Sequence, residues 1–212
     1  MRNSIPPGGG SEDKLWRLIE QRAQPGADKA EIDRRIWDLF GERWAVMFTD
    51  LSGFSRGVAE FGITHFLQII RDHRVLLAPI LEAHDAIVLG QHADSMLVIF
   101  RHPRTALDCA LAMQRKCQEV SRARRPEEKI LLCLGLGYGD VLRASPFDVW
   151  GAEVNAASKL GEDIAKAHEI LITGGMRDAL GEIAGLSFVD LGKAPPGADR
   201  SFRVEYPRAT PA

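Results

Sequence analysis

Asp50 closes the apolar run 44–50, WAVMFTD, and a turn that contains Gly53 follows it at once. The length and apolarity of the run indicate a buried strand. Backbone N–H groups at such a turn, and at the start of the helix after it, can bind phosphate. The carboxylate beside them can hold a hard cation that also binds phosphate oxygens. The alternative role of Asp50 is to cap the following helix.

Asp94 lies in the segment 91–94, between the apolar runs 86–90 and 95–100. This pattern predicts a hairpin, and a hairpin turn accepts aspartate for conformational reasons alone. However, the apolar strands on both sides indicate a central position in a sheet, so the turn can lie beside the end of the strand that carries Asp50. Two carboxylates there would hold one or two Mg²⁺ ions, because without a cation each would raise the pKa of the other.

Asn155 and Lys159 are four residues apart in the segment 154–167, which reads as a helix, so they share a helical face. An amide and an ammonium that point the same way suit a ribose or a polyphosphate. The alternative is an ordinary solvated face. His92 is two residues from Asp94, but a single histidine lacks the spacing of a metal site, and an exposed turn histidine is the favoured interpretation.

The remaining pattern predicts an α+β fold with helices packed on a mainly antiparallel sheet. Residues 1–11 read as a tail, and residues 11–22 and 28–40 as two helices that precede the domain. Further helices are expected at 62–83 and 103–120, and further strands at 130–139, 140–145, 169–173, 186–191 and 201–206.

The composition is that of a soluble globular chain of one domain. The 212 residues are 45% apolar and 26% charged, and the net charge is −2, which excludes a global basic field for nucleic acid. No apolar stretch approaches the roughly 20 residues that span a bilayer. The first residues are polar and rich in Pro and Gly, unlike a secretory signal, and the three cysteines form no CxxC pair. We therefore expect a reduced, cytoplasmic protein with no membrane contact.

Three segments together resemble a known family. They are FTDLSGFS at 48–55, ADSMLVIF at 93–100 and DVWGAEVNAASKL at 148–160, and in this order and spacing they are similar to the catalytic domain of class III nucleotide cyclases. The resemblance covers about residues 43–206, with 1–42 as a tail and helical extension and 207–212 as a C-terminal tail. It implies a ferredoxin-like α+β sheet and a head-to-tail homodimer whose active sites are shared between protomers.

The resemblance also implies roles for individual residues. In one protomer, Asp50 and Asp94 are implied to bind two ions, Mg²⁺ or Mn²⁺, and the backbone after Asp50 to hold the triphosphate. That backbone comprises Leu51, Ser52, Gly53 and Phe54. The other protomer is implied to supply an adenine-reading acid, a ribose-orienting amide, a cation for the transferring phosphoryl group and a further phosphate contact. These are Asp148, Asn155, Lys159 and Lys193, respectively.

Three positions depart from the family pattern. Lys159 stands where the family has an arginine, and an ammonium offers less geometric control than a planar guanidinium. Gly90 stands where the family has an adenine-reading lysine, so Gln91 or His92 must replace it if any side chain does. Ala93 stands where the family usually has glycine.

The resemblance therefore predicts a nucleotidyl cyclase that converts ATP to cyclic AMP and pyrophosphate. A GTP- or pyrimidine-specific cyclase is one alternative, and a cyclase-like domain that binds nucleotide or dimerises without turnover is another. The N-terminal helices are a candidate docking site for a regulatory partner. Nucleic acid is not an expected partner, because the basic residues of 115–125 are not interleaved with aromatic ones.

Overall fold

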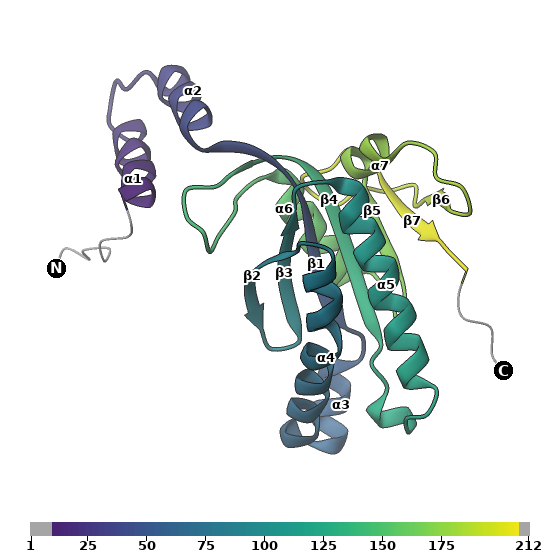
Figure 1. Cartoon of the computed structure of the whole chain (residues 1–212). Helices are drawn as coiled ribbons and strands as arrows, with labels where there is room; N and C mark the ends of the chain where they lie inside the picture. The colour runs from purple at the N-terminus through teal and green to yellow at the C-terminus, as the bar shows by residue number, and fades with distance from the viewer. Residues whose placement is uncertain (1–9, 208–212) are drawn as a thin grey trace.

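The computed structural model describes residues 10–207, apart from the side chains of residues 54–57. Seven strands form one sheet in the order β2-β3-β1-β4-β5-β7-β6 (Figure 1). The strands are β1 Gly41–Leu51, β2 Ile87–His92, β3 Ser95–Phe100, β4 Leu132–Leu142, β5 Ile170–Thr173, β6 Ser187–Asp190 and β7 Ser201–Glu205. All neighbouring strands are antiparallel except the parallel pair β4 and β5, so the predicted α+β fold with a mainly antiparallel sheet is confirmed.

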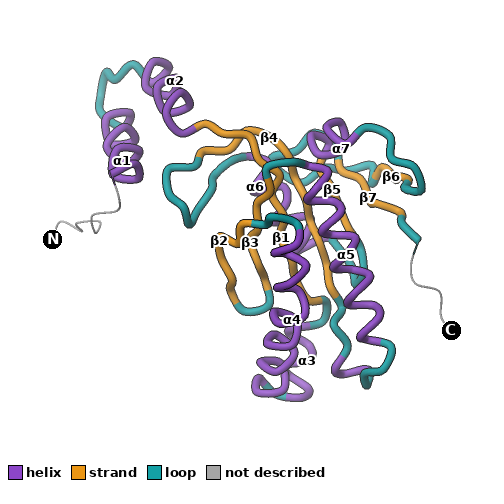
Figure 2. Tube along the Cα trace, viewed as in Figure 1, coloured by secondary structure: helices purple, strands orange, loops and turns teal. Residues whose placement is uncertain are grey.

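The helices divide between the two faces of the sheet. They are α3 Phe54–Phe61, α4 Ile63–Ala83, α5 Pro103–Ser121, α6 Ala152–Ser158 and α7 Gly174–Leu180, with a short 3₁₀ turn, η1, at Pro126–Glu128. Figure 2 shows α4 and α5 across the front of the sheet and α6 behind it. Alternation along β1 explains this arrangement, because Ala45 and Met47 join the core under α4 and α5, while Val46 packs with Val154 of α6.

Two elements differ from the sequence-based expectation. The strands expected at 130–139 and 140–145 are one strand, β4, because its last residues continue the ladder with β1 as far as the pair Leu142 and Gly41. The helix expected at 154–167 is the short α6 followed by a π-helical turn, η2, at Lys159–Ile164. The order of elements predicts one more helix between the strands at 169–173 and 186–191, and α7 confirms it; Thr173 caps this helix, because its hydroxyl accepts a hydrogen bond from the Met176 N–H.

The two N-terminal helices, α1 Gly10–Arg22 and α2 Lys29–Phe40, stand at the start of β1, and α2 continues into β1 without a loop (Figure 1). Leu15, Leu18, Ile36 and Phe40 form a small core with Ala144, and Leu142 and Trp150 pack against it. The extension therefore covers the far end of β4 and the segment just before α6.

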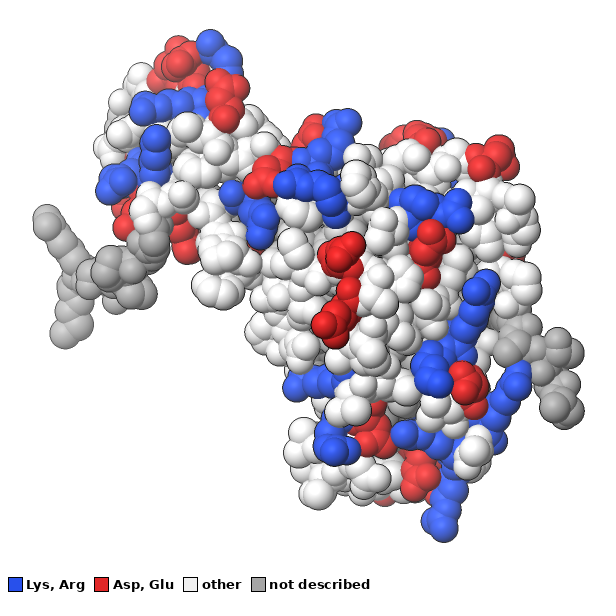
Figure 3. All heavy atoms as spheres, in the orientation of Figure 1, with Lys and Arg blue, Asp and Glu red and all other residues white. Residues whose placement is uncertain are grey.

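The mixed surface charge and the buried free thiols match the near-neutral net charge and the unpaired cysteines of the sequence. Acidic and basic side chains are interspersed over the face shown in Figure 3. None of the helices in the described part of the chain combines the length and the apolarity needed to cross a bilayer. The three cysteines, Cys109, Cys117 and Cys133, are buried, and burial raises the pKa of each thiol to about 12. Unreactive thiols of this kind fit plain core packing.

Candidate active site

Asp50 and Asp94 meet at one end of the sheet centre. Antiparallel pairing of β1 with β3, in which Thr49 lies opposite Met96, places the β2–β3 turn beside Asp50. Strand β2 continues through His92, so the turn is the two residues Ala93 and Asp94 rather than the expected 91–94. Asp94 is only 7% exposed, and Ser95 Oγ donates a hydrogen bond to Asp50 Oδ1 at 3.4 Å.

The electrostatics of the pair reflect this proximity. Burial, then the charge of Asp94 and a hydrogen bond with it, raise the pKa of Asp50 to about 7. The backbone N–H of Leu51 opposes this rise, and the charge of Glu162 adds to it. Like charges in a half-buried site disfavour double ionisation, so below about pH 7 the Asp50 carboxyl keeps its proton unless a cation offsets the charge.

Leu51 is the last residue of β1, Ser52 and Gly53 form the turn, and Phe54 begins α3. Gly53 has φ 87°, a left-handed conformation that favours glycine, and a Cβ there would meet open space. The Ser52 N–H already donates to Leu131 O at 2.9 Å. The expected phosphate cradle is therefore reduced by one donor. The side chain of Phe54 lies outside the described part of the structure.

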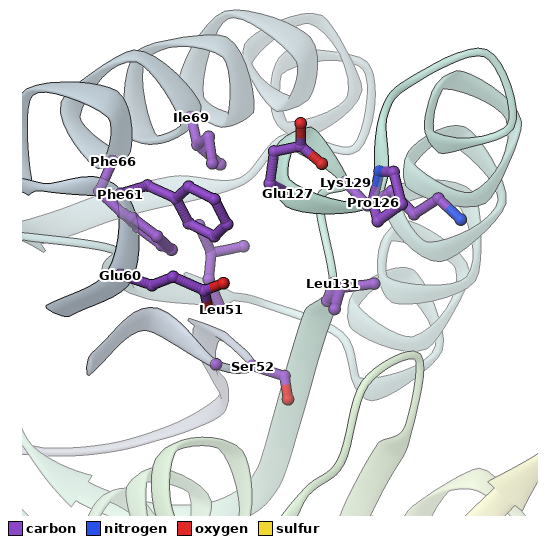
Figure 4. Close-up of a pocket in the computed structure, with 11 residues that line it drawn as sticks. Leu51, Ser52, Glu60, Phe61, Phe66, Ile69, Pro126, Glu127, Lys129 and Leu131 are labelled. Atoms are coloured by element: carbon purple, nitrogen blue, oxygen red, sulfur yellow. The ribbon is translucent and has the colours of Figure 1, made fainter. Parts of the chain in front are cut away.

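A cavity of about 140 Å³ lies behind this turn, on the face covered by α4. Figure 4 shows Phe61, Phe66 and Ile69 on one side of it and Pro126, Glu127 and Lys129 on the other. Leu51 and Ser52 also line it. Because Leu51 points to the face opposite Asp50, this hollow is separate from the carboxylate pair.

A second cavity, of about 330 Å³, lies on the α6 face beside the carboxylate pair. Gly90 and Asp148, the two positions that the resemblance implies for base recognition, both line it. Asp148 Oδ1 accepts a hydrogen bond from the Val149 N–H at 2.8 Å. His92 and Glu162 also line the cavity, whereas Gln91 does not. Sequence reasoning missed Glu162; its only signal was an acid three residues after Lys159.

Asn155 and Lys159 lie one helical turn apart and are exposed, as their spacing predicts. Lys159 Nζ donates to Asp163 Oδ2 at 2.6 Å, and this contact raises the pKa of Lys159. The segment lies unusually close to the sheet, since a Cβ on Gly161 would be 2.9 Å from Phe48 O and Gly135 N. Glycines at both positions therefore allow backbone-to-backbone packing of η2 on β1 and β4.

Lys193 lies apart from the other expected site residues. It is in the loop between β6 and β7, where its carbonyl accepts a hydrogen bond from Ser201 Oγ. Ser201 pairs with Thr173 at the last residue of β5, whereas Asp50 pairs with Cys133 near the first residue of the parallel strand β4. Within one chain, Lys193 and Asp50 are thus at opposite ends of the sheet.

The carboxylate turn is tethered from α4. Ala93 has φ 48°, an unfavourable conformation for a residue with a Cβ. Arg74 of α4 donates a hydrogen bond from Nη2 to Ala93 O at 2.9 Å. The tether fixes the backbone directly before Asp94.

Comparisons with known proteins show the family to which the chain belongs. Residues 41–194 match the family model of the adenylate and guanylate cyclase catalytic domain. "Putative adenylate cyclase 3" of Rhizobium meliloti (strain 1021) is 28% identical over 149 residues, which are 70% of this chain and 25% of that protein. The chain spans a quarter or less of the length of the curated relatives it matches.

Solved structures extend the comparison to the fold. An adenylate/guanylate cyclase/hydrolase from Silicibacter pomeroyi superposes with a TM-score of 0.64 at 25% identity, covering 77% of this chain and 95% of that one. The adenylyl cyclase CyaB from P. aeruginosa has a TM-score of 0.65 at 20% identity, covering 79% of this chain and 97% of that one.

Proposed function

Because the chain belongs to the family of adenylate and guanylate cyclase catalytic domains, we propose that it converts ATP to cyclic AMP and pyrophosphate. The ribose 3′-oxygen forms a bond to the α-phosphorus, the bond from that phosphorus to pyrophosphate breaks, and the hydroxyl proton leaves to solvent. The observation that carries this proposal is the meeting of Asp50 and Asp94 beside the cavity lined by Asp148.

The residues present fit divalent metal ions. Asp50 and Asp94 offer hard oxygen donors. The charge of Asp94 contributes to the raised pKa of Asp50, and a bound cation would offset this repulsion between the two carboxylates. Within residues 10–207, no cluster of three or more His, Cys, Asp and Glu side chains accompanies them, so triphosphate and water must complete the coordination. When bound, Mg²⁺ or Mn²⁺ makes the ribose hydroxyl more acidic and neutralises the polyphosphate.

We assign base recognition to the cavity that Asp148 lines, and at each shared site this cavity belongs to the second copy. The Asp148 carboxylate can accept a hydrogen bond from the adenine amino group, which favours ATP. Gly90 offers no side chain, and His92, which lines the same cavity, is the replacement we assign for it. A second candidate substrate is GTP, because Glu162 adds a second acidic acceptor to the cavity, and guanine offers donors at both N1 and the 2-amino group.

We assign Asn155 and Lys159 to the ribose and to the transferring phosphoryl group of a site shared with a second copy. Both residues are exposed on the side of the sheet that α6 covers. Phe147, which lines the base cavity on the same side, is 77% exposed. An exposed face of this kind supports a homodimer in which each chain completes the site of the other. Lys193, remote from Asp50 in its own chain, then reaches phosphate only across the dimer.

Two assignments concern the surroundings of the enzyme. The three buried thiols support a reducing, cytoplasmic setting. The helices α1 and α2 are the proposed docking site of a regulatory partner, since they pack on Trp150, two residues from Asp148.

Product formation tests the proposal. The purified chain is incubated separately with ATP, GTP, CTP and UTP, with Mg²⁺ or Mn²⁺, next to the Asp50→Ala variant. Cyclic AMP from the wild type alone is the expected result. Another cyclic nucleotide keeps the mechanism and overturns the base assignment. If a folded dimer forms no product, the proposed catalytic activity is wrong. Nucleotide binding by that dimer would then favour a binding domain without turnover, and the departures at Lys159 and Gly90 would explain the lost activity.

A further inference from the structure

Glu153 is half-buried at the second position of α6, and the proposed reaction gives it no role. Its Oε2 accepts a hydrogen bond from the Tyr138 N–H at 3.1 Å and another from Thr173 Oγ1 at 2.6 Å. Thr173 is fully buried, and its Oγ1 also accepts the Met176 N–H that begins α7. One carboxylate therefore connects α6 to β4, β5 and, through Thr173, to α7.

Three glycines leave the space that this side chain fills. A Cβ on Gly139 would lie 2.7 Å from Glu153 Cγ, and one on Gly137 would lie 2.7 Å from Glu153 Oε2. A Cβ on Gly175 would lie 3.0 Å from Glu153 Oε1. Alternate glycines of β4 and one of α7 thus form a cradle around one acid.

The two hydrogen bonds of the Glu153 carboxylate, here called the polar anchor, restrict the orientation of α6 in a way that its apolar contacts do not. Val154 and Ala157 already bury one side of the helix against the sheet, but apolar packing tolerates small rotations. Two hydrogen bonds to one oxygen specify the rotation of the helix about its axis. Burial raises the pKa of Glu153 while these two hydrogen bonds lower it, so the protein places a carboxyl here at an energetic cost.

Asn155 lies two residues after Glu153, on the opposite side of the helix, and Lys159 lies one turn further on; both are exposed. We propose that Glu153 is a positioning residue that fixes the rotation of α6 and thereby directs Asn155 and Lys159 towards the substrate. The expected effect on catalysis rests on the proposed cyclase function, whereas the expected effect on the orientation of α6 rests on the geometry alone.

Two variants of Glu153 give the kinetic test. Glu153→Gln keeps an oxygen that can accept both hydrogen bonds, so its kcat should stay within about twofold of wild type. Glu153→Ala loses both, and its kcat should fall by about tenfold or more with a smaller change in KM, because misplacement of about 1 Å is enough for such losses. Wild-type kcat in Glu153→Ala overturns the proposal.

The glycine cradle allows a test that separates a positioning role of Glu153 from an effect of Glu153 on stability. The Cβ of Gly139→Ala would collide only with the Glu153 side chain, so this variant should lower Tm and kcat. In the double variant Gly139→Ala with Glu153→Ala, the added methyl has room. Its Tm should recover relative to Gly139→Ala, whereas its kcat should remain as low as in Glu153→Ala. Recovery of both quantities would mean that Glu153 acts through stability only, which contradicts the proposal.

A third readout does not need turnover. A nitroxide label on Asn155→Cys reports the mobility of the exposed side of α6, and the native thiols are buried and resist labelling. The label should become more mobile with Glu153→Ala and stay unchanged with Glu153→Gln. An inactive wild type with this mobility pattern overturns the proposed function but not the anchor; equal mobility in all three backgrounds overturns the anchor.

Discussion

At the scale of single residues, burial and neighbouring charges shift two pKa values in opposite directions. Burial and Asp94 raise the pKa of Asp50 to about 7, from 3.8. Burial, and then the charge of Arg74, lower the pKa of His73 to about 4, from 6.5. His73 is fully buried, and neither ring nitrogen has a hydrogen-bond partner within the described residues. Each shift links the free energy of unfolding to pH, with opposite sign.

The first prediction concerns Asp50→Asn in the metal-free protein. Folded Asp50 holds its proton between about pH 4 and about pH 7, where the unfolded chain has lost it, so wild-type stability from this group falls as pH rises. The variant should lack this fall, and it should also lose the stabilisation by added Mn²⁺. Urea denaturation across this range, with EDTA or Mn²⁺, measures both effects. A variant still stabilised by Mn²⁺ as strongly as wild type would contradict the metal assignment.

The second prediction concerns His73→Leu. The unfolded chain takes up a proton on His73 as pH falls from about 6.5 to about 4, while the folded chain does not, so acid destabilises the wild type. The leucine variant should therefore gain stability relative to wild type as pH decreases through this window. Because Asp50 acts in the opposite direction there, the informative quantity is the difference between variant and wild type at each pH. A pH-independent difference would show that His73 does not titrate as expected.

At the scale of elements, the β2–β3 turn that carries Asp94 combines a strained residue with a tether. Ala93 has φ 48°, and Arg74 of α4 donates a hydrogen bond to its carbonyl. The left-handed conformation costs a residue with a Cβ about 1–2 kcal/mol, and glycine avoids that cost. The tether holds the turn in place despite the strain.

The third prediction follows for this turn. Ala93→Gly should raise the free energy of unfolding by up to about 1 kcal/mol, since relief of strain exceeds the added freedom of the unfolded chain. Arg74→Gln should reduce cyclase activity several-fold by loosening the turn, and Arg74→Lys should reduce it less. Denaturation curves and initial rates measure these effects, with Arg71→Gln as the control, because Arg71 is an exposed residue of the same helix whose ion pair is with Asp72. Equal losses in Arg71→Gln and Arg74→Gln would contradict the tether.

At the scale of the whole molecule, the described chain places the carboxylate pair at one end of the sheet and Lys193 at the other. Asn155 lies exposed on α6, and Lys159 lies exposed at the start of η2. The N-terminal helices precede the first residue of β1, which is the end of that strand remote from Asp50. In the proposed head-to-tail pair, these two groups of residues from different chains would come together.

The fourth prediction tests the shared site by mixing two inactive variants. Asp50→Ala removes one of the two carboxylates, and Lys159→Ala removes the ammonium group proposed to contact the transferring phosphoryl group, so each variant alone should be inactive. Random exchange of subunits gives mixed dimers with one intact site each, and activity should return to about a quarter of the wild-type rate. The control is the Asp50→Ala variant mixed with Asp94→Ala, which should remain inactive because both losses fall in the same half-site. No recovery despite subunit exchange would contradict the composite site.

The fifth prediction concerns removal of residues 1–42. Trp150 packs against the small core of α1 and α2, and its ring lies 6.4 Å from that of Trp16 in an edge-on contact. Truncation should lower Tm and raise KM for ATP, because Trp150 precedes α6 and follows Asp148 by two residues. Size-exclusion chromatography coupled to light scattering should still find the dimer. An unchanged KM would remove the link between the extension and base recognition.

Local patterns in the sequence were enough for the element types, the turn after Asp50 and the shared face of Asn155 and Lys159. These features depend on neighbours a few residues apart, through side-chain periodicity and turn conformation. The family motifs added the proposed roles of individual residues, and the family itself is confirmed. Single-residue departures at Gly90, Ala93 and Lys159 were also visible without coordinates.

Only the tertiary structure decided features that depend on pairing between distant segments. The register of β1 with β3 brought Asp94 to Asp50, and the ladder with β1 made β4 continuous. The use of the Ser52 N–H by Leu131, the remote place of Lys193 and the glycine cradle of Glu153 have no local signal in the chain. A residue's partners across a sheet are set by register and packing, which sum many weak contacts over the whole molecule, so the sequence around each residue does not reveal them.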